Sequence, residues 1–435
     1  MKRKKMNVLQ LTIITIINMM GSGIIMLPAN LSQVGSMSIL SWIVTAGGAM
    51  CLAYGFSRAG MYSNKEAGMG GYTEYSFGKS GSFMTNYVYG ISLVIANVAM
   101  AVSMIGYMAA VFNVHLTPVQ ITLGTIITLW IATLLNFGGS EITGKFSSIT
   151  ILGVIIPVVL ISIVGWFYFN PQLYITNWNP HHYGFFNGVS KSISITLWAF
   201  LGLESASADA DSVDDPKKNV PIAVLTATAV VAVLYIVSTS VIQGIAPDFN
   251  IAHSNAPFGY VFTQIFNPVV GKTMMILMII SCFGSLVGWQ FTIADVFKVS
   301  AREGYFPKVF GKLNRADTPI AGMVIITIVQ TILSLMTISP SLSKQFTILI
   351  NLAVVTNVIP YILVMASLPA MQYLEWIPEK SRKFTNFIAF LAAIYSFYAI
   401  YASGVVAIAG GAMVAFFGWI IYGFLDYQLN IFHKN

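Results

Sequence analysis

One carboxylate in this sequence lies where a charge is costly. Glu204 falls inside a long apolar segment, deeper than any other of the 15 acidic residues. Ionisable side chains at such a depth are expensive to bury and usually serve a function. Trp198 precedes Glu204 by six residues, and tryptophan is the best aromatic partner for a cation, at about 0.5–2 kcal/mol. A carboxylate beside an aromatic face would suit an ammonium group, with Trp198 or Trp289 covering attached methylenes.

Each of these residues also has a plainer interpretation. Glu204 could carry a proton instead of binding a ligand, and both roles can coexist because proton and cation would compete for one carboxylate. Trp198 and Trp289 could be ordinary packing aromatics. Cys51 and Cys282 fall in apolar segments without the spacing of a metal or redox motif, so we interpret them as small buried hydrophobes.

Other polar groups favour structural roles. Asp295 stands three residues before Lys298 on a predicted helix, which favours an intrahelical ion pair. His181 and His182 fall in a predicted loop without further metal-ligand spacing, so no metal or cofactor is expected. The segment 214–218 (Asp-Asp-Pro-Lys-Lys) is typical of a turn that caps the following helix.

Glycines interrupt two apolar segments at similar depth. Residues 18–25 read NMMGSGII and residues 198–206 read WAFLGLESA. A helix inside a bilayer must satisfy its own backbone, so interruptions are expected only where they line a cavity. Paired interruptions in corresponding helices indicate a transporter's central binding site, where freed amides can bind a carboxylate. Close helix packing is the alternative for such glycines, but two interruptions in register, one with a glutamate, favour a site.

The segments that carry these residues are typical of a polytopic membrane protein. Charged residues make up 9 % of the chain, hydrophobic residues 56 %, and the mean hydropathy is +0.77. No soluble domain of this size could bury that much apolar surface. Blocks near the length of about 20 residues that a spanning helix needs number twelve, at about 8–34, 37–58, 83–112, 117–137, 146–168, 188–209, 220–245, 269–298, 319–338, 345–369, 386–403 and 405–427.

The basic residues predict the orientation of these helices. With twelve spans and a cytoplasmic N-terminus, nineteen of the 22 Lys and Arg residues fall on the cytoplasmic side. Only Lys191, Lys272 and Lys344 remain for the other side, as the positive-inside rule requires. Both termini are therefore expected in the cytoplasm. The basic pI reflects topology and anionic-lipid contact, not a nucleic-acid partner.

These strings also resemble a known family. NMMGSGIIMLP at 18–28 and WAFLGLESA at 198–206 look like the first and sixth helices of the amino acid–polyamine–organocation transporters, and most of all the bacterial basic amino acid/polyamine antiporters. The resemblance implies one all-α transmembrane domain over 1–435, with a LeuT-type 5+5 inverted repeat at about 8–168 and 188–369. Two extra helices follow at about 386–427. It also implies a bacterial inner-membrane location and a possible homodimer.

The family's binding residues can be carried over to matching positions. In the resemblance, a substrate carboxylate meets the backbone at Ser22 and Gly23, and Trp198 serves as aromatic gate and cation-binding face. Glu204 matches one acidic position of the family. Glu74, expected in a loop before the third helix, matches another acidic position, and Tyr89 fits a gating position. The full set implied for substrate binding is Ser22, Gly23, Ile24, Asn97, Met100, Trp198, Gly202, Glu204, Trp289 and Tyr422.

The resemblance implies exchange of a cationic amino acid for its amine, with ornithine and putrescine as the best pair, besides proton-linked putrescine uptake. Lysine/cadaverine, arginine/agmatine and histidine/histamine exchange stay open, as does proton-coupled uptake. A receptor is disfavoured because no soluble domain is evident, and an enzyme because no nucleophile–base constellation appears. Ala59 in place of a cysteine, and acidic Asp209, Asp211 and Asp295, depart from the relatives' pattern and leave the exact amine open.

Overall fold

The computed structural model describes residues 6–21, 23–65, 68–139, 143, 150, 152–205, 213–304, 306–314, 317–338 and 341–432. Over these ranges the chain folds into helices and their connections. The sole extended pairing within them is an isolated bridge between Met6 and Val213. The prediction of an all-α polytopic membrane protein is therefore confirmed at this level.

Eight helices in the described ranges are long and apolar enough to cross a membrane. They are α3 (Ser38–Tyr62), α4 (Met69–Phe112), α5 (Pro118–Asn136), α11 (Pro216–Ile245), α14 (Pro268–Arg302), α16 (Leu342–Leu374), α17 (Glu379–Ala402) and α18 (Val405–Phe432). Shorter helices occupy the other predicted blocks: α1 (Val8–Met20), α2 (Leu27–Ser32), α7 (Leu152–Val164) with η1 (Gly165–Tyr168), α9 (Phe185–Trp198) and α15 (Ile320–Met336). The connections hold α8 (Pro171–Thr176), α12 (Asp248–Ala252), α13 (Pro257–Ile265) and η3 (Lys308–Gly311).

One predicted position is wrong. Glu74 was expected in a loop before the third helix, but α4 already begins at Met69 and includes it. The chain bends at Gly78, where φ is +63° and ψ is −158°, a conformation that only glycine adopts readily. A short helix before the bend thus joins the long span after it. The polar residues and glycines of this stretch form no apolar pattern from which a helix could be predicted.

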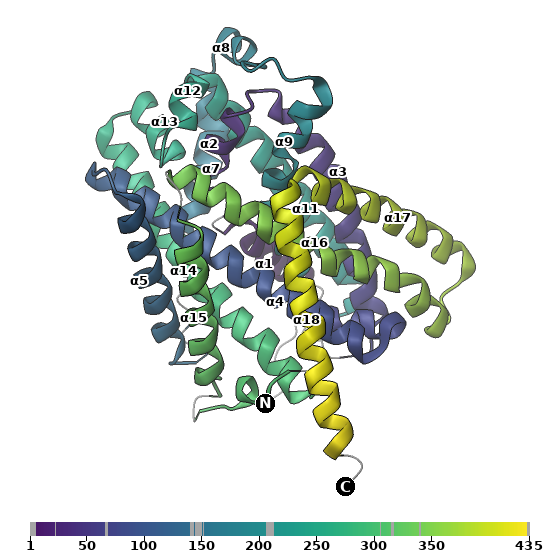
Figure 1. The fold of residues 1–435 in the computed structure, drawn as a ribbon. Coiled ribbons are helices and arrows are strands. Elements are labelled where there is room, and N and C mark those ends of the chain that lie inside the picture. Colours follow the sequence, from purple (N-terminus) through teal and green to yellow (C-terminus); the bar gives the residue numbers. More distant parts are fainter. Residues whose placement is uncertain are drawn as a thin grey trace.

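The helices pack around a central pair. α4 and α16 form the most extensive helix contact, α14 packs on α4, and α11 packs on both α1 and α3 (Figure 1). These are the elements that surround the two glycine-containing segments. α17 and α18 lie at the periphery, where many of their large apolar side chains are exposed.

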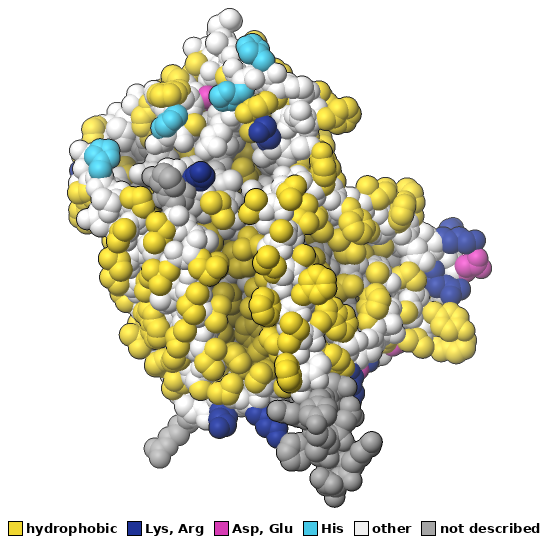
Figure 2. Space-filling view, in the orientation of Figure 1, with side chains coloured by type: hydrophobic (Ala, Val, Ile, Leu, Met, Phe, Trp, Pro, Cys, Tyr) yellow, Lys and Arg dark blue, Asp and Glu magenta, His cyan; other side chains and the backbone are white. Residues whose placement is uncertain are grey.

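Apolar and charged side chains occupy different parts of the surface. Figure 2 shows hydrophobic side chains across the middle of one face, with Lys and Arg at its lower end and right-hand edge and a few near its upper end. Both chain ends are at the lower end (Figure 1). Exposed apolar side chains that would be costly in water suit a lipid environment. The two cysteines are free, Cys282 buried and Cys51 partly buried, as expected of small hydrophobes.

Candidate functional site

Both predicted interruptions are present. α1 ends at Met20, and the chain does not resume a helix until α2 begins at Leu27. α9 ends at Trp198, and residues 199–204 form turns, with Gly202 at a φ of +107°. Among the described residues, no acceptor bonds the backbone amides of Gly23, Ile24 or Ile25. Backbone amides outside regular helix at this point are the kind of donor that a substrate carboxylate would require.

The two interruptions touch each other. The side chain of Asn18 donates from Nδ2 to Ser205 Oγ at 2.8 Å, and Ser205 Oγ donates to the Gly202 carbonyl at 2.6 Å. A methyl group on Gly202 would lie 2.8 Å from the Asn18 carbonyl oxygen, and one on Gly23 would lie 3.4 Å from Ala199 Cα. Gly202 therefore permits an approach that a side chain there would prevent, whereas a methyl group on Gly23 would be in ordinary contact.

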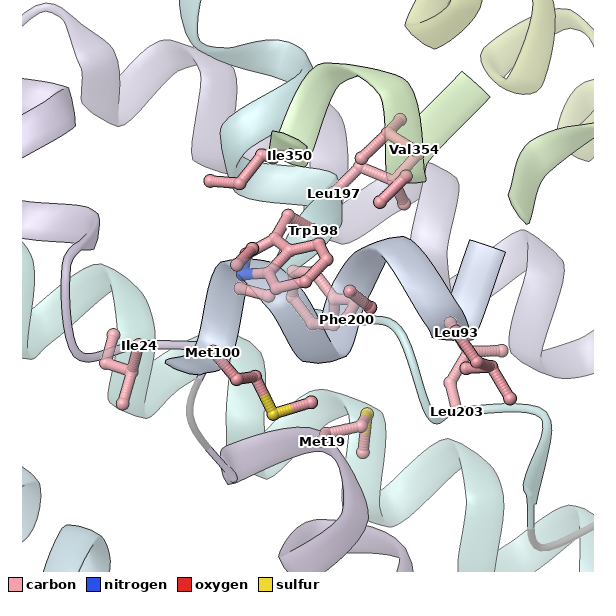
Figure 3. Packing of buried hydrophobic residues seen from close by; sticks show 14 of the residues in the cluster. Met19, Ile24, Leu93, Met100, Leu197, Trp198, Phe200, Leu203, Ile350 and Val354 are labelled. Carbon is pink, nitrogen blue, oxygen red and sulfur yellow. The ribbon is translucent and has the colours of Figure 1, made fainter. Parts of the chain in front are cut away.

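A small cavity of about 30 Å³ opens between the interruptions. It brings together five of the predicted residues, Gly23, Asn97, Met100, Trp198 and Trp289. Figure 3 shows Trp198 and Met100 close together at this point, with Met19 nearby. The other lining residues are Asn18, Met19, Gly21, Leu93, Ala96 and Leu201. No acidic or basic side chain lines the cavity as the structure describes it.

The aromatic wall of the cavity is held from the α16 side. The Trp198 ring meets Phe346 edge to face, with ring centroids 6.4 Å apart, and Trp198 is 5 % exposed. Its indole N–H is buried without a partner among the described residues. Buried indoles usually have an acceptor, so this N–H is available to one that a substrate would bring.

Glu204 lies outside the cavity lining and is held by three donors. Tyr89 donates to Oε1 at 2.8 Å, Tyr361 donates to Oε2 at 2.5 Å, and the Gly202 amide donates to Oε2 at 3.0 Å. The residue is 4 % exposed. This arrangement ties α4 and α16 to the interrupted segment after α9. The structure thus brings two of the predicted residues, Tyr89 and Glu204, into direct contact.

Sequence reasoning missed Tyr361. It follows Pro360 in an apolar helix, and its ring packs at 4.8 Å from that of Phe56. A buried phenol needs a partner for its hydroxyl, which was the available signal. Nothing in the sequence shows that this partner is Glu204, 157 positions away.

A buried amide network behind the cavity was missed as well. Asn97 donates from Nδ2 to Gln290 Oε1 at 2.8 Å, which leaves Asn97 Oδ1 unpartnered within the described chain. Gln290 in turn bonds Gln330, Thr133 and Thr327. Isolated polar residues on several apolar helices were the sequence signal, but their pairing depends on the fold.

The remaining predicted residues lie apart from the cavity. Glu74 forms an ion pair with Lys65 at 2.8 Å. Tyr422 on α18 packs against Phe83, with ring centroids 5.3 Å apart. Ile24 is fully buried within the first interruption, and Gly202, in the second, adjoins Trp289.

Two further predictions have separate outcomes. Asp295 pairs with Lys298 within one helix, as predicted. Ser22, Asp209 and Asp211 lie outside the described residues. No group of three or more metal-ligating side chains occurs in the ranges described.

Comparisons with known proteins extend over the whole chain. A family model described as "Amino acid permease" matches residues 6–425. The chain is 57 % identical to "Putrescine transporter PotE" of Escherichia coli (strain K12) over 434 residues, covering 100 % of this chain and 99 % of that protein. It is also 57 % identical to the protein of the same name from Haemophilus influenzae over 430 residues, with 99 % of each chain covered.

A more distant relative has another amine in its name. "Cadaverine/lysine antiporter" of Escherichia coli (strain K12) is 32 % identical over 366 residues, or 82 % of each chain. The family and these relatives are transporters, which confirms the prediction of a transporter over an enzyme. The resemblance seen in the two interrupted segments therefore holds across the sequence, and the chain belongs to the amino acid permease family.

Proposed function

We propose that this protein is an antiporter that exchanges a cationic amino acid for its amine, with ornithine and putrescine as the pair. Two relatives at 57 % identity are putrescine transporters by name, and one at 32 % is a cadaverine/lysine antiporter. Both kinds of name point to an aliphatic diamine. Lysine/cadaverine exchange is the nearest alternative, since its substrates differ by one methylene and a pocket discriminates such a difference by only about 1–3 kcal/mol.

The cavity between the interruptions is the observation that carries this proposal. Amides at Gly23 and its neighbours, which lie outside regular helix, suit the carboxylate of an amino acid. The rings of Trp198 and Trp289 suit methylenes and an ammonium, and Asn97 Oδ1 offers an acceptor. At about 30 Å³ the cavity has room for little more than water. Substrate entry therefore requires the walls to separate, and this is a contracted state of the site.

Glu204 acts in this proposal as a gate whose carboxylate becomes available on opening. The bonds from Tyr89 and Tyr361 hold α4 and α16 against the interrupted segment. When those bonds break, the carboxylate faces the route to the cavity and pairs with a substrate ammonium or a proton. Binding by the amine and protonation then exclude each other.

The other predicted residues receive subordinate roles. We propose that Gly23, Asn97, Met100, Trp198 and Trp289 contact the substrate. Ser22 and Ile24 would add backbone contacts, Gly202 the close approach, and Tyr422 and Glu74 an indirect effect through α4, the helix that each contacts or belongs to.

We further propose twelve spans in a single domain with a LeuT-type 5+5 repeat. The eight long helices, together with α1/α2, α7, α9 and α15, would supply this number. The distribution of basic residues supports cytoplasmic termini and anionic-lipid contact. A bacterial inner membrane suits the bacterial relatives, and a homodimer is proposed from the family resemblance alone.

Exchange in proteoliposomes tests the substrate pair. External ornithine should accelerate efflux of preloaded labelled putrescine severalfold over buffer, while an acidic amino acid should have no effect. No acceleration by any basic amino acid would refute exchange. Net uptake into empty liposomes driven by a pH jump would instead support proton-coupled uptake.

Replacement of Glu204 tests the gate. Glu204→Gln keeps the size and loses the charge, so putrescine exchange should fall at least about tenfold, as expected for loss of a charged hydrogen-bonded group. The folded yield should change much less. Glu379→Gln, which alters an exposed ion pair with Lys383, serves as control. Wild-type exchange by the Glu204 variant would remove this carboxylate from the mechanism.

A further inference from the structure

Five polar side chains form one buried network beside the cavity. They come from four helices, and each is at most 1 % exposed: Asn97 on α4, Thr133 on α5, Gln290 on α14, and Thr327 and Gln330 on α15. Of the five, only Asn97 also lines the cavity. The network therefore connects the site to α5 and α15, which contribute no lining residue.

Gln290 is the centre of the network. Gln290 and Gln330 form a reciprocal amide pair, with both N···O distances 2.9 Å. The Nε2 atom of Gln290 also lies 3.0 Å from Thr133 Oγ1 and 3.2 Å from Thr327 Oγ1. Its Oε1 atom accepts from Gln330 and, at 2.8 Å, from Asn97 Nδ2. Every donor and lone pair of the Gln290 amide thus has a partner.

The two threonines determine which way this amide faces. Thr133 Oγ1 lies 2.9 Å from the Leu129 carbonyl, and Thr327 Oγ1 lies 2.9 Å from the Met323 carbonyl. The two hydroxyls are also 2.6 Å apart. Each hydroxyl has one proton, so two protons are shared among these three contacts and neither is left for Gln290. Both threonines therefore present lone pairs to Gln290, which must turn its nitrogen toward them.

The orientation of the Gln290 amide determines the orientation of the Asn97 amide. Since the Gln290 nitrogen faces the threonines, its oxygen faces Asn97, and Asn97 must donate with Nδ2. The Oδ1 atom of Asn97, a residue that lines the cavity, is then left buried and without a partner in the described chain. An unsatisfied buried acceptor is costly, and a substrate ammonium would satisfy it. With the amide reversed, Asn97 would present a donor and would suit a carboxylate instead.

We infer that Gln290 is a positioning residue that fixes the polarity of the Asn97 amide and so makes this part of the site select an ammonium. The inference rests on the proposed function, because the ammonium is that of a cationic amino acid or its amine. It adds a specificity determinant that never touches substrate. The orientation of the Gln290 amide is in turn set by the threonine hydroxyls of α5 and α15.

Putrescine exchange kinetics of network variants test this role. Gln290→Met should raise KM for putrescine about tenfold with kcat nearly unchanged, because one hydrogen bond to a charged group loses its alignment. Gln290→Glu, neutral when protonated and still able to accept from Asn97 Nδ2, should restore KM to within about threefold of wild type. Gln330→Met is the matched control. It breaks the amide pair but leaves the Asn97 bond and the threonine contacts in place, so KM should stay near the wild-type value.

A double-mutant cycle separates positioning from folding. If Gln290 acts through Asn97, adding Gln290→Met to Asn97→Ala should raise KM no further than Asn97→Ala alone. Additive effects of the two substitutions on KM would overturn the positioning role alone. So would a second result, in which Gln290→Met and Gln330→Met lose kcat and folded protein equally while KM is unchanged. Failure of the wild-type protein to exchange putrescine or any basic amino acid would overturn the proposed function and this inference together.

Discussion

At the scale of single residues, the chemistry divides between a neutral cavity and a nearby carboxylate. The cavity offers amides, an amide oxygen and aromatic rings. Glu204 is separated from it and bound by two phenols and one backbone amide. A buried carboxylate is stable only with such donors. In the described structure the carboxylate is therefore held outside the cavity lining, and the proposed opening would break those bonds.

Tyr361→Phe should weaken the closed gate. The change removes the donor at 2.5 Å and leaves Glu204 with Tyr89 and Gly202. Loss of a hydrogen bond to a charged group costs about 1.5–3 kcal/mol, so thermal stability should fall. In the proposed gate, opening no longer has to break this bond, so putrescine exchange should become severalfold faster. Melting in detergent and exchange in proteoliposomes measure the two effects. Tyr401→Phe, at a position 71 % exposed on α17, is the control, and equal behaviour of the two variants would contradict the gate.

The sequence predicted the members of the site better than their partners. Trp198, Asn97, Gly23 and Trp289 could be named because glycine interruptions and the family resemblance mark local positions. Tyr361, Gln290 and Gln330 could not, since a lone polar residue in an apolar helix has no local signal for what it faces. The same limit applies to Glu204, whose two phenol partners have no signal in the sequence.

At the scale of elements, the interruptions depend on backbone conformations that the sequence encodes directly. Gly202 has a φ of +107°, in the region that favours glycine. The helical blocks were likewise predictable from apolar length, because a spanning helix has a nearly fixed number of residues. The helical start of α4 was not, because nine residues with two glycines and a glutamate have no such signature.

Gly202→Ala should therefore impair both folding and exchange. The added methyl group would lie 2.8 Å from the Asn18 carbonyl oxygen, besides the strain of a positive φ of about 1–3 kcal/mol. Gly404→Ala is a matched control, because Gly404 also has a positive φ, +86°, but open space around it. Exchange and melting temperature of the two variants separate collision from strain. If both lose the same amount, the close contact between the interruptions is unimportant.

At the scale of the whole molecule, the connecting helices α8, α12 and α13 lie at the end opposite the N and C labels (Figure 1). α12 packs on α2, the helix that continues from the first interruption. Its Asp248 is 5 % exposed, and neither carboxylate oxygen has a hydrogen-bond partner among the described residues. Burial raises the pKa of Asp248 to about 7, and the nearby Ser32 hydroxyl opposes this rise without forming a well-aligned bond. A titratable group thus sits between a connection and a helix that borders the site.

The stability of the protein should consequently depend on pH through Asp248. Above the usual aspartate pKa of about 3.9 the unfolded chain loses this proton, whereas the folded chain keeps it until about pH 7. The folded state then binds more protons, so stability falls as pH rises across this window and levels off above it. Asp248→Asn removes the dependence. The free energy of unfolding of this variant, relative to that of the wild type, should rise by up to about 3 kcal/mol between pH 5 and pH 8, because one pKa unit corresponds to about 1.4 kcal/mol. Asp214→Asn, at an exposed position, is the control and should show the same dependence of stability on pH as the wild type. If Asp248→Asn also shows the wild-type dependence, the Asp248 carboxyl is already ionised at pH 5.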